Sequence, residues 1–358
     1  MNLRIPGPIP VPDDILQILS TQMINHRGPE FKELLYRVTS RLKLVFATQN
    51  DMFILSSSGT GAMEAAIANT LSVGDKVLCA SIGSFGNRFG EIAKRFGAEV
   101  NMLNFEPGTS INTEVLEQTL NENNNLKAVL VTHNETNTGV TNNLKQVAKI
   151  VKKDPDRLLL VDGISSVCSI PVETDEWKCD VVVSASQKGW MLPPGLAFIS
   201  FSPLAWKFNS VSNMPKFYFD LIQYKSYYDK GQPPWTPALS IIFALDKALE
   251  QIIDEGMENV YNRHSSIANQ VRNGIAKIGL DLFPHLSVAS NTVTAVKSPK
   301  GLDADKLRKE VQKEHNVVLA GGYGPQQGKI FRIGHLGYVK PIEIDETINA
   351  IELTLKNF

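Results

Sequence analysis

The chain has 358 residues, and its 36 basic and 37 acidic side chains leave a formal net charge of −1 at pH 7. This length supports a large hydrophobic core, and the balanced charge excludes the general basic field that nucleic-acid binding needs. No apolar run reaches the length of a transmembrane helix, and the first residues lack the apolar region of a signal peptide, so we expect neither nucleic acid nor membrane as a partner. Cys79, Cys168 and Cys179 lack metal-ligand spacing, which predicts no metal site and favours reduced thiols in a cytoplasmic protein.

The N-terminal segment is rich in proline between Pro6 and Pro12. Such a segment is neither a helix nor a central strand, because proline lacks an amide hydrogen and fixes φ. We therefore expect an extended arm, followed by a helix over residues 13–23 and a second helix that ends near Ala47. From its composition alone, the arm is equally well a tethered chain terminus.

A serine- and glycine-rich turn follows the strand expected at residues 52–55 and opens an alanine-rich helix over residues 62–71. A strand, a turn and a helix start gather free backbone N–H groups, and the helix dipole favours an anion there. Ser58, Gly59 and Thr60 therefore predict a phosphate site, although ordinary helix capping by either hydroxyl explains them equally well. The turn has no P-loop lysine and no Gly-x-Gly-x-x-Gly spacing, which argues against a nucleotide.

Two further junctions between a strand and a loop carry aromatic or polar side chains. The strand expected at residues 76–80 leads into a glycine-flanked loop with Phe85, an aromatic residue that could also plug the interface between two lobes. The strand at residues 128–132 is an unbroken apolar run, and the loop after it contains His133 and Thr136. A lone histidine at a strand end is more often structural than catalytic, so we treat His133 as a secondary candidate.

The most informative junctions are those of Asp162 and Lys188. Asp162 follows the apolar run at residues 158–161 and so lies at the carboxyl end of a buried strand, the edge at which open α/β sheets bind ligands. A carboxylate at this position could bind a ligand, cap the next helix or bind a metal. Lys188 lies on a turn between strands expected at residues 181–184 and 196–200. Burial would lower the pKa of its amine and expose a nucleophile, although most lysines are simply solvated. Together they fit a pyridoxal phosphate enzyme, in which an acid pairs with the ring nitrogen and a lysine holds the aldehyde carbon.

The C-terminal part has the pattern of a smaller α/β lobe after a Tyr-, Lys- and Pro-rich surface segment at residues 214–237. Helices are expected over residues 238–255, 257–278, 303–315 and 342–355, and strands over residues 291–296, 317–320 and 331–334. We therefore expect a large domain at residues 1–255 and a smaller domain at residues 256–358. Arg332 points away from its apolar strand neighbours, either as a surface charge or as a planar group that binds a carboxylate.

Six short motifs, spread over nearly the whole chain, match one enzyme family in sequence and in order. They are Gly7-Pro8, Ser57-Ser-Gly-Thr-Gly61, Thr132-His-Asn-Glu-Thr-Asn-Thr-Gly139, Val161-Asp-Gly-Ile-Ser165, Ser184-Ala-Ser-Gln-Lys188 and Phe331-Arg-Ile-Gly334. The chain thus resembles the fold-type I pyridoxal phosphate enzymes of the class V aminotransferase family, close to the alanine–glyoxylate and serine–pyruvate aminotransferases. Each motif is weak alone, whereas the ordered set is specific.

The resemblance implies an α/β fold with a mostly parallel central sheet, a smaller C-terminal domain and pyridoxal 5'-phosphate as cofactor. Lys188 would form the Schiff base and shuttle the substrate's α-proton, while Asp162 would hold the ring nitrogen. Phe85 would stack on the ring, where the alanine–glyoxylate type has tryptophan instead. Thr136 would bond to the phenolic oxygen of the cofactor.

The other matched residues divide between the phosphate and the substrate. In the family, Ser58–Thr60 and Gln187 would bind the phosphate. Thr236 would reach the phosphate of a neighbouring subunit, which implies a homodimer, although an ordinary helix cap explains this threonine as well. The arm at Gly7 would cross the mouth of the site, and Arg332 would hold the substrate's α-carboxylate.

We therefore predict an aminotransferase that moves an amino group from a small L-amino acid, alanine or serine, to a small 2-oxo acid, glyoxylate or pyruvate. An aspartate-using relative stays open, because Arg27, Arg41 and Arg88 lie outside the positions that the motifs explain. A cofactor-binding relative that acts as a subunit of another complex also stays open. A cysteine desulfurase needs a reactive cysteine after the lysine, and all three cysteines precede Lys188.

Overall fold

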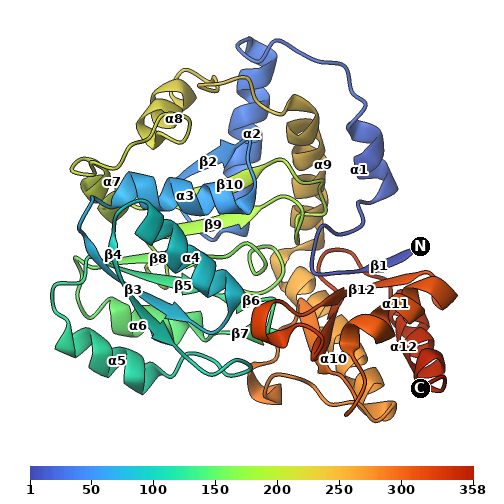
Figure 1. The fold of residues 1–358 in the computed structure, drawn as a ribbon. Coiled ribbons are helices and arrows are strands. Elements are labelled where there is room, and N and C mark those ends of the chain that lie inside the picture. The colour runs from blue at the N-terminus through green and yellow to red at the C-terminus, as the bar shows by residue number, and fades with distance from the viewer.

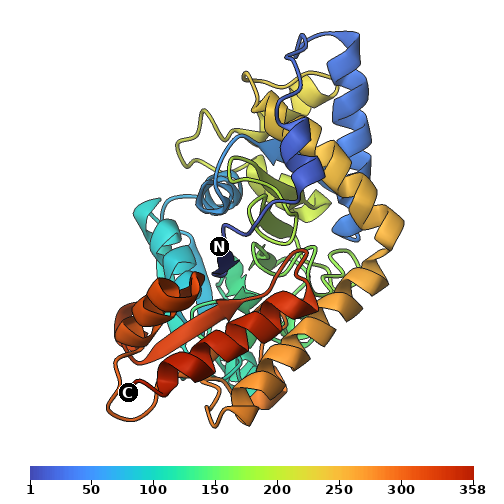
Figure 2. The same ribbon diagram turned by 90° about the vertical axis from the view of Figure 1, so that its right-hand side faces the viewer.

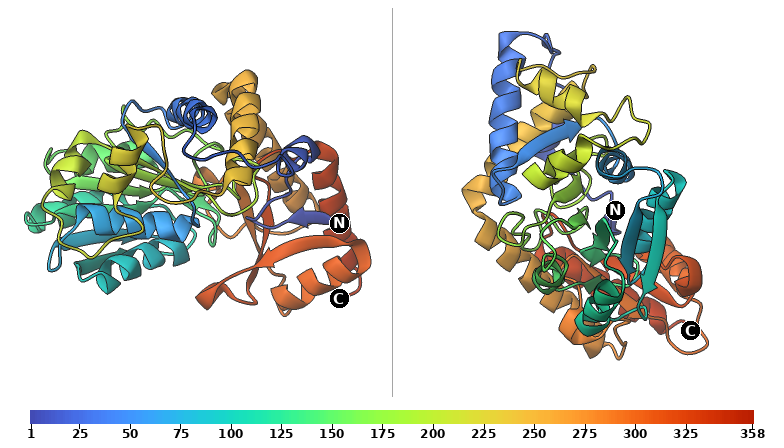
Figure 3. Two further views of the ribbon diagram at one scale, coloured as in Figure 1. Left: turned by 90° about the horizontal axis from the view of Figure 1, so that it is seen from above. Right: turned by 90° about the vertical axis from the view of Figure 1, so that its left-hand side faces the viewer.

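The computed structural model describes residues 1–358, which form a larger unit around a seven-stranded sheet and a smaller unit around a four-stranded sheet (Figure 1). A two-stranded hairpin, β6 (Asn134–Glu135) with β7 (Val140–Thr141), adds to the larger unit. Seen from above, the two units lie side by side (Figure 3). No helix combines the length and the apolar character that a membrane crossing requires.

The seven-stranded sheet is mostly parallel. In spatial order its strands are β2 (Asp51–Leu55), β10 (Ala197–Phe201), β9 (Val181–Ala185), β8 (Leu158–Asp162), β5 (Ala128–Thr132), β3 (Lys76–Ser81) and β4 (Glu99–Asn104). Only β10 runs antiparallel to its neighbours. Every residue of β5, β8, β9 and β10 is buried, because helices cover both faces of these apolar strands. The fold predicted for the large unit is confirmed.

Helices cover the two faces of this sheet in two groups. The bounds are α1 (Asp13–Ile18), α2 (Pro29–Val45), α3 (Gly59–Thr70), α4 (Ser84–Arg95), α5 (Thr113–Glu122), α6 (Leu144–Val151), α7 (Pro203–Asn209), α8 (Leu221–Tyr228) and α9 (Leu239–Glu255). Val129 and Val131 of β5 share a core with α1, α2, α5, α6 and α9, whereas Ala128 and Leu130 share one with α3, α4, α7 and α8. This alternation follows from the two-residue period of a strand.

The smaller unit contains a strand from the N-terminus. Its sheet has the order β1 (Asn2–Arg4), β12 (Val317–Gly321), β13 (Ile330–Gly334) and β11 (Val293–Lys297). Its helices are α10 (Met257–Lys277), α11 (Ala304–His315) and α12 (Pro341–Leu355), with single turns η1 (Leu286–Val288) and η2 (Gly324–Gln326). β1 pairs in parallel with β12 and lies beside the orange and red C-terminal elements in Figure 1. The proline-rich arm therefore leads from the smaller sheet to the larger unit.

The connection between the units is helical. Figure 2 shows α9 and α10 in succession along one side of the molecule, and Gly256 joins them with a φ of 82°. A positive φ suits glycine, which has no Cβ to clash with the backbone. The expected division into residues 1–255 and residues 256–358 falls at this junction and stays a prediction.

In three places the local sequence pattern did not predict the secondary structure correctly. The N-terminal helix ends at Ile18 instead of Met23. Ile15 is its one buried residue, so little packing stabilises further turns. The segment 214–237, where we expected a surface segment and no helix, contains α8, whose first turn is capped by the Asp220 side chain. The strand β1 was not expected, because three residues carry too little pattern to indicate a strand.

Candidate active site

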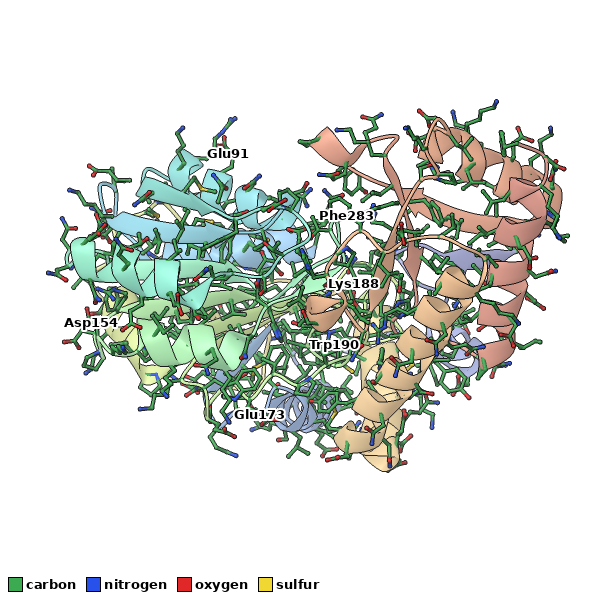
Figure 4. All side chains as sticks on the ribbon, turned by 90° about the horizontal axis from the view of Figure 1, so that it is seen from below. Glu91, Asp154, Glu173, Lys188, Trp190 and Phe283 are labelled. Carbon is green, nitrogen blue, oxygen red and sulfur yellow. The ribbon has the colours of Figure 1, made fainter.

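The carboxyl ends of β8 and β9 bring the predicted acid and lysine to one cavity. Asp162 is the last residue of β8 and pairs in register with Val183 of β9. β9 ends at Ala185, and the turn that follows carries Lys188. Both side chains line a cavity of about 230 Å³. Figure 4 shows Lys188 at the junction of the two units.

The lysine amine has a lowered pKa. Burial is the main cause and brings the pKa of Lys188 down to about 8. The positive charges of Arg332 and Arg88 act in the same direction, whereas Asp162 opposes them. The turn therefore presents an amine that loses its proton more readily than a solvated lysine does.

The N-terminal arm packs directly against this lysine. Lys188 Nζ donates a hydrogen bond to the carbonyl oxygen of Pro6. A Cβ added to Gly7 would lie 2.8 Å from Nζ, and Gly7 has a φ of +127°. Residue 7 must therefore be glycine both for its backbone conformation and for the space that the lysine occupies.

Asp162 is a buried carboxylate without an ion-pair partner in the protein. Its oxygens accept hydrogen bonds from the Ile164 backbone N–H at 3.0 Å and from the Thr132 hydroxyl at 3.1 Å. Burial nevertheless raises the pKa of Asp162 to about 6. A cation placed beside it would stabilise its charged form. No group of three or more His, Cys, Asp or Glu side chains in the chain could hold a metal ion.

The start of α3 forms an open, donor-rich end of the same cavity. Ser58, Gly59, Thr60 and Gln187 all line it. Ser58 occupies the N-cap position, yet its side chain makes no capping hydrogen bond, so the capping alternative is wrong for this residue. The Gln187 amide makes no hydrogen bond with the protein, and its Oε1 is buried. The Ser58 hydroxyl and the Gln187 Nε2 are hydrogen-bond donors, and as such they fit the phosphate of a bound ligand.

Phe85 is positioned by a buried acid that sequence reasoning missed. Glu135, which is fully buried, accepts hydrogen bonds from the backbone N–H groups of Phe85 at 2.8 Å and Gly86 at 3.3 Å. The Arg88 guanidinium lies 4.9 Å from the centre of the Phe85 ring. Burial raises the pKa of Glu135, while these backbone donors oppose the rise. The acid thereby anchors the first turn of α4 at the cavity wall.

Arg332 is buried in the smaller unit but reaches the larger one. It is 2% exposed, so the alternative of a surface charge is wrong. Its Nε donates to the Gly321 carbonyl at 2.7 Å, and its Nη1 donates to the Thr136 carbonyl at 3.0 Å. Burial lowers its pKa from the usual value of an arginine. Nη2 takes part in neither of these hydrogen bonds and can bind a ligand, with the Tyr323 side chain close enough to hydrogen bond to the guanidinium.

A second cavity of about 550 Å³ adjoins the first and contains Arg332. The residues common to both cavities are Gly7, Phe85, Thr136, Lys188 and Tyr323. These shared residues surround the space between the lysine amine and the arginine. Of the predicted residues, the structure thus brings together all except Thr236.

Thr236 and His133 lie elsewhere. Thr236 is exposed and lines neither cavity. It is not the cap of α9 either, because Ala238 is in that position, and its contact with a neighbouring subunit stays a prediction. His133 lines a different cavity with Trp177, and burial lowers its pKa to about 4. It is therefore a neutral, structural histidine.

The arginines outside the motifs differ in their surroundings. Arg41 bonds to Asp246 at 2.6 Å, and the Arg27 guanidinium lies 5.4 Å from the centre of the Tyr227 ring. Arg88 alone among the three lines the cavity of Lys188. Its position shortly after Phe85, on the first turns of a helix, was the available signal for this placement.

Comparisons of this sequence and this structure with known proteins point to one enzyme family. The model of the aminotransferase class-V family matches residues 18–328. A soluble hydrogenase small subunit of Synechococcus sp. is 41% identical over 99% of this chain and 92% of its own length. The serine–glyoxylate aminotransferase of Methylorubrum extorquens is 37% identical over 99% of this chain and 90% of its own. The solved structure of alanine–glyoxylate aminotransferase from Nostoc sp. superposes with a TM-score of 0.95 at 30% identity, covering 99% of this chain and 94% of that one.

Proposed function

Since the chain belongs to the aminotransferase class-V family, we propose that it uses pyridoxal 5'-phosphate to move an amino group from alanine or serine to glyoxylate or pyruvate. The names of the serine–glyoxylate and alanine–glyoxylate relatives support these small substrates. One observation carries the proposal: two adjoining cavities share Lys188, and the larger of them also contains Arg332. An α-amino acid whose carboxylate binds the guanidinium then directs its α-carbon towards the lysine.

The smaller cavity fits the proposed cofactor. The open start of α3 at Ser58 and the unpaired Gln187 amide suit its phosphate. Phe85 suits the ring face, and the Thr136 hydroxyl suits the phenolic oxygen. When bound, pyridoxal phosphate withdraws electrons from the bonds of the substrate's α-carbon.

Lys188 holds and moves the proton. Because its pKa is lowered to about 8, roughly a tenth of the amine is unprotonated at pH 7, compared with well under a hundredth for a solvated lysine. A neutral amine can accept the substrate's α-proton and return it as the ammonium group. The arm at Gly7 packs against Lys188 and shields one side of the amine from solvent.

Asp162 would hold the ring nitrogen of the bound cofactor in its protonated form. Opposite charges about 4 Å apart at an effective dielectric of roughly 20 interact by about 4 kcal/mol, which corresponds to about three pKa units. This attraction exceeds the cost of burial, which raises the pKa of the carboxyl group from 3.8 to about 6. The pair is therefore ionised at neutral pH.

The charges of the larger cavity favour a substrate with one carboxylate. Arg332 provides a free Nη2 for the α-carboxylate. The other arginine of this cavity, Arg308, bonds to Asp305 at 2.7 Å, so its charge is already compensated. Arg88 lines only the smaller cavity, where it stacks on Phe85 and interacts electrostatically with Asp162. Alanine and serine therefore fit better than aspartate, which needs a second uncompensated cation.

We also propose a homodimer with shared active sites. Phe217 and Trp235 stack with ring centroids 5.0 Å apart, and Phe217 is 76% exposed. The neighbouring Tyr218 donates a hydrogen bond to the Ser56 carbonyl, beside the turn that would hold the phosphate. An exposed aromatic cluster indicates an interaction surface, and a second chain that covers it would bring Thr236 to the phosphate of its partner.

Two competing functions receive less support. Cys79, Cys168 and Cys179 are free and buried, burial raises the pKa of each thiol, and none lines either cavity. A cysteine desulfurase requires a reactive thiolate at the site. Free buried thiols suit the reducing cytoplasm, where we place the protein. A role as a subunit of another complex is suggested only by the names of two hydrogenase-subunit relatives.

A donor and acceptor panel tests the proposed function. Purified protein loaded with pyridoxal phosphate is assayed with alanine, serine, aspartate and glutamate against glyoxylate, pyruvate and 2-oxoglutarate. We expect alanine and serine to give the highest kcat/KM with glyoxylate or pyruvate. A tenfold preference for aspartate or glutamate, about 1.4 kcal/mol in transition-state binding, would show that the substrate is larger. Absence of transamination with every pair would favour the subunit role.

A further inference from the structure

Tyr323 is the one residue of the C-terminal unit that lines both cavities. It follows β12 in a loop with Gly321 and Gly322 before it and Gly324 after it. Gly324 has a φ of +55°, and a Cβ on Gly322 would lie 2.4 Å from the Gln326 carbonyl oxygen. The path of the loop thus depends on glycine, and Tyr323 carries its only large side chain at the site.

One buried amide fixes the backbone of Tyr323 to the larger unit. Asn137 is 2% exposed, and its Oδ1 accepts a hydrogen bond from the Tyr323 backbone N–H at 2.9 Å. Its Nδ2 donates to the Tyr323 carbonyl at 3.3 Å and to the Ser84 hydroxyl at 2.8 Å. Ser84 begins α4, directly before Phe85. A single side chain therefore holds the loop of the smaller unit at the start of α4.

The ring of Tyr323 covers one face of the Arg332 guanidinium. Arg332 Cζ lies 4.7 Å from the ring centroid, and two of the three guanidinium nitrogens already bond to the Gly321 and Thr136 carbonyls. A carboxylate must approach along the remaining edge, next to the ring. Tyr323 is 54% exposed, so the position of its ring depends on the backbone bonds to Asn137 and on the contact of its side chain with Arg332.

We propose that Tyr323 determines substrate specificity: its ring, held at Arg332 by Asn137, limits the substrate side chain to small groups. This inference rests on the proposed aminotransferase function and names the residue responsible for its preference for alanine and serine. Asn137 acts as a positioning residue, because it reaches the substrate only through Tyr323. Loss of the ring would join the two cavities and admit a longer side chain.

Replacement of the ring tests the proposal on the holoenzyme. Tyr323→Ala should raise the ratio of kcat/KM for phenylalanine to that for alanine by tenfold or more, whereas Tyr323→Phe should leave it within twofold. A matched control is Tyr338→Ala, because Tyr338 is 56% exposed and stacks on Arg263 at 5.4 Å but lines neither cavity. The control should leave the ratio unchanged. Asn137→Ala should shift the ratio in the same direction by a smaller factor.

A binding measurement makes the test independent of turnover. Calorimetric titration of the holoenzyme with 3-phenylpropionate and with acetate compares a large and a small carboxylate. Tyr323→Ala should bind 3-phenylpropionate at least tenfold more tightly than the wild type does, with acetate affinity within twofold. Unchanged relative affinities and an unchanged donor ratio would overturn the role of Tyr323. A wild type that transaminates no donor would instead overturn the proposed function, and the two carboxylates would still decide the inference.

Discussion

The cofactor end and the substrate end of the site are built in different ways. At the cofactor end, Asp162 and Lys188 follow two adjacent, fully buried strands of one sheet. At the substrate end, Arg332 is held by carbonyl groups from both units, and the arm at Gly7 and the loop at Tyr323 complete the wall. One end is thus fixed by a single sheet, whereas the other depends on several distant segments being in place. Substitutions at the cofactor end should therefore remove chemistry, and those at the substrate end should change affinity.

Lys188→Ala should give the largest effect. We expect the rate of transamination to fall by roughly 10⁴-fold, because a positioned acid–base group contributes up to this factor and no other lysine lines either cavity. Borohydride reduction of the wild type should fix the cofactor to Lys188, and peptide mapping would identify the labelled residue. Lys149→Ala, an exposed lysine of α6, should behave as the wild type. A label on another lysine would place the chemistry elsewhere.

Asp162→Asn should give the next largest effect and keep the cofactor bound to Lys188. An amide cannot provide the attraction of about 4 kcal/mol that we assign to the carboxylate, so the rate of the half-reaction should fall by roughly 10³-fold. Stopped-flow absorbance with alanine and no acceptor measures this step. Near-native conversion in the variant would remove Asp162 from the mechanism.

The same two ends differ in how well sequence alone predicts them. The strands expected at residues 128–132 and 158–162 have the same bounds as β5 and β8, because unbroken apolar runs and the polar residues after them are local signals. A parallel sheet places such strand ends at one edge, so the sequence pattern was sufficient to place Asp162 and Lys188 at one site.

The residues that the sequence did not predict, Glu135, Asn137 and Tyr323, act through contacts between segments that are distant in the chain. Glu135 binds the backbone of Phe85, 50 residues away in sequence, and Asn137 binds the backbone of Tyr323, 186 residues away. An acid, an amide and an exposed tyrosine in loops carry no local pattern that indicates such partners. Thr236 stays a prediction for a related reason, since its expected partner belongs to a second chain.

The buried acid at the cofactor end should also give a measurable pH dependence after the cofactor is removed. Burial raises the pKa of Asp162 from 3.8 to about 6, so the folded state binds this proton more tightly than the unfolded state does. The resulting stability is fully present below about pH 4 and is lost as the pH rises through about 6, a change of about 3 kcal/mol.

Urea unfolding of the cofactor-free wild type and of Asp162→Asn, from pH 4 to pH 7, measures this difference. Carboxyl groups other than Glu135, whose pKa Asp162 also raises, contribute equally to both proteins, so the wild type should lose stability relative to the variant as the pH rises. Parallel curves for the two proteins would mean that Asp162 titrates as an ordinary carboxyl group.

Arg332→Lys should give the smallest effect and sharpen the contrast between the two ends. Lysine keeps the positive charge but loses the planar group that bonds to the Gly321 and Thr136 carbonyls while it faces a carboxylate. Loss of one charge-assisted hydrogen bond costs about 1.5–3 kcal/mol, roughly a 10- to 150-fold rise in KM. Because amino donor and oxo-acid acceptor both carry the α-carboxylate, KM should rise by a similar factor for each, while kcat changes less.

The matched control for this variant is Arg308→Lys, which lines the same cavity but is bonded to Asp305 and should leave both KM values within twofold. A rise for only one of the two substrates would show that donor and acceptor bind at different groups. A fall in kcat as large as that of Asp162→Asn would show that Arg332 acts in the chemistry itself. In that second case the two ends would not be separable, because an interaction made equally in the ground state and the transition state changes KM and leaves kcat unaltered.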